Sequence, residues 1–138
     1  MGSNGDTLMG SIGLLVLRVG TAGVLFFGHG LAKVTNLAQG AKSFPDPLHL
    51  GSATSFGLVV FAEAVCTLFV ALGLFTRFAL LPIIGFLTVA FFIYHAPDPF
   101  RQKELALAFL VSFVTLFFTG PGKFALDSWI GVRVGKQD

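Results

Sequence analysis

The chain has 138 residues, of which 54% are hydrophobic and 12% charged, with a mean hydropathy of +0.84 and a net charge of +2. A water-soluble domain carries about 25% charged residues, and a fold of this size could not hide so much apolar surface, so the composition excludes an ordinary soluble domain. The small net charge and the absence of a basic run exclude a nucleic-acid-binding protein. We therefore expect a single integral membrane domain over residues 1–138.

The first two apolar stretches each contain one charged residue. The first runs from about residue 8 to 31 and is interrupted by Arg18. Because no basic residue precedes it and it is too long for a signal-peptide core, we expect it to stay uncleaved and to act as the insertion signal. The second runs from about residue 54 to 75 and is interrupted by Glu63. Both exceed the roughly 20 residues that a spanning helix needs.

The other two apolar stretches are shorter. The third covers about 78–95, with Pro82 near its beginning, and the fourth covers about 103–119. We expect a long polar loop over 32–53, a tight connection at Thr76-Arg77 and an amphipathic tail over 120–138, in which Trp129 suits the membrane interface. An even number of spans places both termini on one side. The predicted fold class is all-α, an integral membrane four-helix bundle.

Arg18 and Glu63 are the most informative residues, because a charge at the bilayer centre costs about 2.5–3.5 kcal/mol unless it turns inward and finds a partner. Each lies roughly 15 Å into its helix at 1.5 Å per residue, and the two helices run in opposite directions. We therefore predict that Arg18 and Glu63 form an ion pair, directly or through water. A purely structural pair and a functional pair remain open.

Polar residues at the far ends of three helices predict a site. His29 lies eleven residues after Arg18 and on the same helix face, with Lys33 one turn further on, while His95 ends the third helix and Glu104 begins the fourth. Imidazoles beside a carboxylate can exchange protons with a reducible ligand such as a quinone. Metal binding has no diagnostic spacing here. The alternative is that helix ends are simply polar.

Small and aromatic residues are assigned to packing. Four glycines are expected to let the first helix approach its neighbours: Gly20, Gly23, Gly28 and Gly30. The single cysteine, Cys66, excludes an intramolecular disulfide and is expected to pack as a small apolar residue. Three Phe-Phe pairs, at 26–27, 91–92 and 117–118, are expected to cover lipid-facing and packing surfaces, while a minority of phenylalanines line an isoprenoid groove.

Several segments resemble the DoxX family of bacterial membrane proteins. The first is RVGTAGVLFFGHGLAK, which contains Arg18, Gly23, His29, Gly30 and Lys33. The second is FAEAVCTLFVALGLFTR, which contains Glu63 and ends with residues 73–77. The resemblance continues at His95 and Glu104 and is clearest in GPGKFALD, residues 120–127, where Ala125 stands in place of the usual serine.

This resemblance implies a multi-pass protein of the bacterial inner (plasma) membrane. Members are linked to thiosulfate:quinone oxidoreduction, to quinone or thiol stress, and to complexes with soluble redox enzymes. The resemblance points to His29, His95 and Glu104 as catalytic positions and to three residues as ligand-binding positions: Arg18, Lys33 and Glu63. Related four-helix proteins that pass electrons between disulfides and quinones use several cysteines, so one cysteine excludes that mechanism within this chain.

The expected function is a quinone-associated subunit or accessory of a membrane redox system. No flavin, haem or iron–sulfur motif is present, so the chain is at most an oxidoreductase subunit that needs a partner for its electrons. The alternative is a non-enzymatic scaffold that anchors a partner protein complex. Expected partners are membrane lipids, together with a redox protein or further copies of the chain. A transporter or channel is a third class, which would require an oligomer.

Overall fold

The computed structural model describes residues 4–130, with helices and connecting turns and no strand in that range. The first spanning helix combines α1 (Asn4–Leu25), the π-helical segment η1 (Phe26–Gly30) and α2 (Leu31–Val34). The second combines α4 (Ser52–Val60), η2 (Phe61–Cys66) and α5 (Thr67–Leu72). The third combines α6 (Thr76–Val89) and η3 (Ala90–Tyr94), and the fourth is α7 (Phe100–Thr119). Short helices α3 (Leu37–Ser43) and α8 (Leu126–Trp129) complete the fold.

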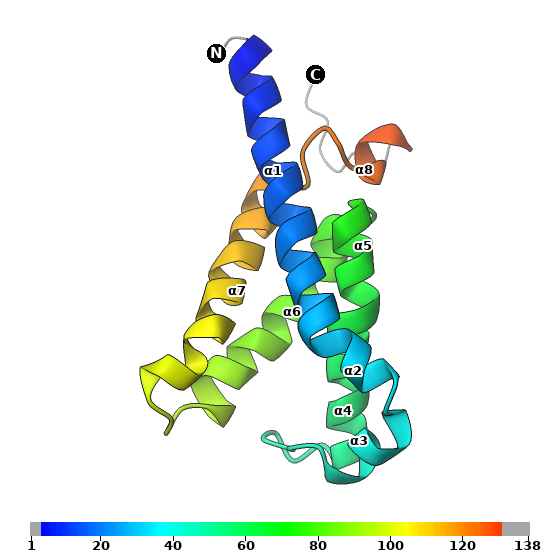
Figure 1. The fold of residues 1–138 in the computed structure, drawn as a ribbon, viewed down its shortest axis with the longest axis vertical. Helices are drawn as coiled ribbons and strands as arrows, with labels where there is room; N and C mark the ends of the chain where they lie inside the picture. Colours follow the sequence, from blue (N-terminus) through cyan, green and yellow to red (C-terminus); the bar gives the residue numbers. More distant parts are fainter. Residues whose placement is uncertain (1–3, 131–138) are drawn as a thin grey trace.

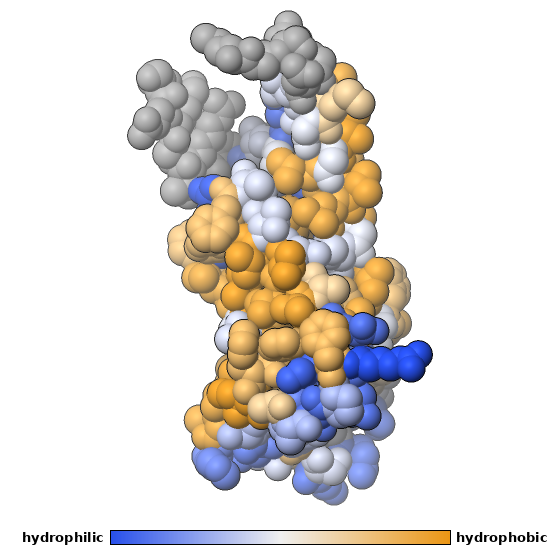
Figure 2. All heavy atoms as spheres, turned by 90° about the vertical axis from the view of Figure 1, so that its left-hand side faces the viewer, coloured by the Kyte–Doolittle hydropathy of each residue, from blue (hydrophilic) through white to orange (hydrophobic). Residues whose placement is uncertain are grey.

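All four predicted spans are present, as helices long and apolar enough to cross a membrane. They form an all-α bundle in which α1 packs against α5 and α7, while α6 packs against α7 and η2. The beginning of α1 and helix α8 lie at the same end of the molecule (Figure 1). On the face shown in Figure 2, apolar residues cover the middle of the molecule. Hydrophilic residues gather at the end away from α8 and the beginning of α1. The part of the predicted amphipathic tail over 131–138 lies outside the described residues.

The bundle core is made of aliphatic and aromatic side chains contributed by all four spanning helices. Side chains exposed by 2% or less include Leu25, Val70, Leu80, Ile83 and Phe113. Many large apolar side chains outside this core are exposed, for example Phe27 at 72% and Phe118 at 76%. That distribution fits a protein whose solvent is lipid, because such surface needs no burial within the protein.

Three connections differ from the sequence-based expectation. The predicted polar loop over 32–53 contains the end of α2 and helix α3, so its irregular parts are a turn at 35–36 and the segment over 44–51. The predicted hairpin at Thr76-Arg77 is the start of α6, and the turn itself is formed by residues 73–75. Helix α7 begins at Phe100, a few residues earlier than expected, because Pro99 precedes it as the N-cap residue.

Asp46 organises the loop over 44–51. Its carboxylate accepts hydrogen bonds from the Ser55 hydroxyl and from the backbone N–H groups of Leu50 and Gly51, at 2.7–2.8 Å. The bond from Ser55, followed by those from Gly51 and Leu50, lowers the pKa of Asp46 below its ordinary value. Asp46 therefore satisfies donors at the beginning of α4, which has no cap from its own N-cap residue.

We expect Asp46→Ala to loosen this loop. At neutral pH, amide hydrogen exchange over 44–55 should speed up severalfold, because three donors lose their acceptor. Since the folded-state pKa is lowered, the stabilisation is complete above the ordinary carboxyl pKa and is lost as the pH falls through the folded-state value. Acidification should therefore loosen the native loop and leave the variant unchanged, once intrinsic exchange rates are corrected. Equal exchange in both proteins at neutral pH would contradict this role.

Candidate functional site

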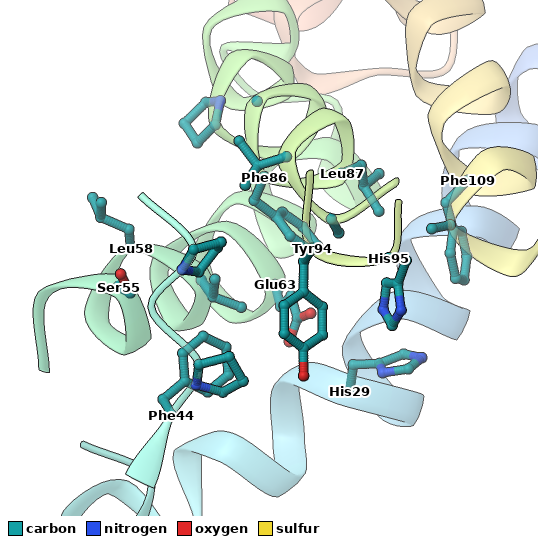
Figure 3. Close-up of a pocket in the computed structure, with 18 of the residues that line it drawn as sticks. His29, Phe44, Ser55, Leu58, Glu63, Phe86, Leu87, Tyr94, His95 and Phe109 are labelled. Atoms are coloured by element: carbon teal, nitrogen blue, oxygen red, sulfur yellow. The ribbon is translucent and has the colours of Figure 1, made fainter. Parts of the chain in front are cut away.

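Three of the four spanning helices contain a π-helical segment. Such segments are rare, and those found inside α-helices occur frequently at functional sites. Here η1 carries His29, η2 carries Glu63, and η3 carries Tyr94 and is followed directly by His95. All four of these residues line the same cavity (Figure 3). The irregular backbone is therefore concentrated around one place in the bundle.

The cavity has a volume of about 700 Å³, within the usual range for small-molecule sites. It is enclosed by η1, α4, η2, α6, η3, the first half of α7 and the loop over 44–50. Most of its walls are apolar, and they include four phenylalanines: Phe44, Phe61, Phe86 and Phe109. Its polar lining residues are His29, Lys33, Ser55, Glu63, Tyr94, His95 and Gln102. The three predicted Phe-Phe pairs do not contribute to these walls.

Lys33 and Glu63 form an ion pair at the cavity, with 2.6 Å between Lys33 Nζ and Glu63 Oε2. The Glu63 side chain is 5% exposed and that of Lys33 is 22% exposed. The predicted pairing of Glu63 with Arg18 is therefore wrong. Gly30, twelve residues after Arg18, is the residue that contacts the Glu63 backbone. Arg18 consequently lies about 18 Å further along its helix.

Gly30 makes this geometry possible. A Cβ atom at position 30 would lie 2.8 Å from the Glu63 carbonyl carbon and closer still to its oxygen, so η1 and η2 touch through their backbones. This contact brings Lys33, one turn beyond His29, over the Glu63 carboxylate. A Cβ atom at Gly20, Gly23 or Gly28 would meet nothing within 4 Å, so the expectation of close approach holds for Gly30 alone among the four.

Arg18 serves the opposite end of the bundle. Its side chain is 1% exposed, and its guanidinium donates to the backbone carbonyls of Val70, Ala71 and Phe124. It thus ties the first helix to the end of the second and to the chain that follows α7. Within the described residues its Nε has no hydrogen-bond partner. These contacts give Arg18 a structural role and place it outside the cavity.

Sequence reasoning missed the role of Asp127. Its carboxylate accepts from the backbone N–H of Phe75 at 2.7 Å and from both the N–H and the hydroxyl of Thr76. It therefore supplies from a distance the cap that the start of α6 lacks locally, where Phe75 has a left-handed φ of 47°. The segment over 120–127 is held against this turn by an additional bond from Asp127 N to Gly73 O. The one sequence feature that could have indicated this cap is the acidic residue at the end of GPGKFALD.

The two predicted histidines lie near one another at the edge of the cavity (Figure 3). His29 makes an edge-to-face contact with Phe109, with ring centroids 6.4 Å apart. His95 Nδ1 lies 2.7 Å from Asp98 Oδ2, which orients the ring and leaves the other nitrogen free of that bond. Asp98 was not predicted, although its spacing of three residues from His95 was visible.

Glu104 does not join the histidines. It lies a full turn inside α7, is exposed and does not line the cavity. Cys66 is buried in the core, as expected for a packing residue. Among residues 4–130, no three His, Cys, Asp or Glu side chains are placed to hold a metal ion together. The structure thus brings together His29, Lys33, Glu63 and His95, but not Arg18 or Glu104.

Four apolar helices enclosing a partly polar cavity define a multi-pass membrane protein. The chain belongs to the DoxX family, whose model matches residues 13–96, more than half of the chain. The matched segment includes every predicted site residue except Glu104, and it ends before the motif at 120–127. Comparisons with curated proteins and with solved structures each found no significant match.

Proposed function

We propose that this protein is a quinone-associated subunit of a redox system in the bacterial inner membrane. The observation that carries the proposal is the cavity of about 700 Å³, in which apolar walls surround two imidazoles and the Lys33–Glu63 pair. A quinone head is a flat apolar ring with two carbonyl acceptors, and its reduction takes up protons. Such a ligand needs aromatic or aliphatic walls and a few well-placed donors.

His29 and His95 are the groups proposed to act on the head. A neutral imidazole has one donor nitrogen and one acceptor nitrogen, so each ring can donate to a quinone carbonyl and later exchange that proton. The bond between His95 Nδ1 and Asp98 orients His95, and the contact with Phe109 supports His29. Electrons come from a partner protein, because a histidine and carboxylate site transfers protons only.

The proposal is tested by measuring quinone that copurifies with the protein. Each of His29→Ala and His95→Ala should reduce bound quinone about fivefold, since a hydrogen bond contributes roughly 1 kcal/mol and 1.4 kcal/mol corresponds to tenfold. Glu104→Gln is the matched control, because Glu104 is a titratable residue near the same end that is exposed and outside the cavity.

Unchanged quinone content in both histidine variants, at normal protein levels, would overturn the proposal. A native protein that carries no quinone but copurifies in mild detergent with a stoichiometric protein partner would instead support the anchoring function.

A further inference from the structure

Some residues that line the cavity are also exposed on the outer surface of the bundle. Leu58 and Phe61, on the second spanning helix, are 54% and 48% exposed. Across from them, Gly85 of α6 lines the cavity and is likewise exposed. Exposed lining residues on these two neighbouring helices indicate one opening of the cavity between α4 and α6.

This opening lies at the depth of the hydrocarbon. Leu58 is six residues from the start of its span at Ser52, and Gly85 is nine residues from the end of its span at Tyr94. At 1.5 Å per residue these positions are about 9 and 14 Å from the polar end, inside a hydrocarbon core about 30 Å thick. The opening therefore faces lipid, whereas the histidines lie at the polar end.

Gly85 keeps the opening clear. A Cβ atom at this position would meet nothing within 4 Å, so the backbone borders empty space. Pro82, one turn earlier, also lines the cavity and has a compact ring. Both residues are smaller than Phe86 and Leu87, which line the cavity from the same helix. They therefore leave a gap in the cavity wall on the α6 side.

We infer that the ligand has a long isoprenoid tail, which leaves the cavity between α4 and α6 across Gly85, and that the ligand enters through this gap from the bilayer. The inference rests on the proposed function, since it assigns the head to His29 and His95. The tail then contacts Phe61 and Phe86 before it reaches Leu58 and the gap at Gly85.

The charges of the cavity favour a neutral head over a phospholipid phosphate. Among the described side chains that line the cavity, Lys33 is the one permanent cation, and Glu63 already neutralises it at 2.6 Å. A phosphate would need cationic groups that are not already paired. A neutral quinone needs only hydrogen-bond donors, which the imidazoles provide.

The test uses Gly85→Phe in the full-length protein, reconstituted in phosphatidylcholine vesicles. Bound quinone per protein is measured after re-extraction from vesicles that contain a long-tail quinone, and a tail-free quinone with the same head is titrated separately. Gly85→Phe should lower bound long-tail quinone at least tenfold while leaving the dissociation constant of the tail-free quinone within about twofold. Gly85→Leu should give a smaller loss in the same direction.

Gly57→Phe is the matched control, because Gly57 is an exposed glycine of α4 that does not line the cavity and has open space around it. It should change neither measurement. Undiminished long-tail binding in Gly85→Phe, or equal loss of both quinones, would overturn the tail path alone. The tail path would also be overturned if Gly85→Phe lost a copurified phospholipid and kept its quinone. A native protein that binds neither quinone would overturn the proposed function, and the tail path with it.

Discussion

Lys33→Leu should lower the free energy of unfolding by about 3–5 kcal/mol, because it leaves a buried carboxylate without its partner. Glu63 is 5% exposed and cannot turn to water without moving η2, which touches Gly30 through its backbone. Denaturant or thermal unfolding of the purified protein in detergent measures this loss.

A double-mutant cycle isolates the pair. Glu63→Leu should cost less than Lys33→Leu, because Lys33 is 22% exposed and its long chain can carry the ammonium group to the nearby interface. The double variant Lys33→Leu/Glu63→Leu should recover much of the loss, since it strands no charge. Losses that add up without recovery would show that the two side chains do not interact.

Gly30→Ala should destabilise the protein by about 1–3 kcal/mol or more, as expected for overpacking at a tight contact. The added methyl group would lie 2.8 Å from the Glu63 carbonyl carbon, and backbone atoms cannot give way as a flexible side chain can. Because η1 and η2 must separate, Lys33 should lose contact with Glu63 and the cavity should change shape. Both the unfolding free energy and the copurified quinone should therefore fall.

Gly28→Ala is the control for this substitution. Gly28 lies two residues away in the same π-helical segment, but a Cβ atom there would meet nothing within 4 Å. Since alanine costs less conformational entropy than glycine in a helix, the change should be neutral or slightly stabilising. Equal losses in both variants would contradict the backbone contact assigned to Gly30.

Hydropathy was sufficient to predict the four spans, because lipid requires long helices with internally satisfied backbones. It also identified Arg18 and Glu63 as inward-facing residues, and both are buried. The partners were wrong because helical spacing gives the depth of a residue along its own helix but not the level at which two helices cross. That level is determined by the contact of Gly30 with Glu63, which involves residues 33 positions apart.

The remaining differences concern local backbone geometry. Nothing in the sequences FFGHG, FAEAVC and AFFIY distinguishes a π-helical turn from an α-helical one. These segments nevertheless carry His29, Glu63 and Tyr94, which line the cavity. Because α7 begins at Phe100, Glu104 lies one turn inside the helix and away from the histidines. The capping role of Asp127 could not be predicted, because its partners lie 51 and 52 residues away in the sequence.

The carbonyl acceptors of Arg18 bear on how the chain is made. The guanidinium enters the bilayer with the first helix, but the carbonyl of Phe124 is synthesised 106 residues later. A nascent chain that stops before this residue exposes an incompletely solvated cation to hydrocarbon. A chain that ends before residue 124 would therefore lack one of the three acceptors of the buried guanidinium, and we expect it to be less stable than the finished protein.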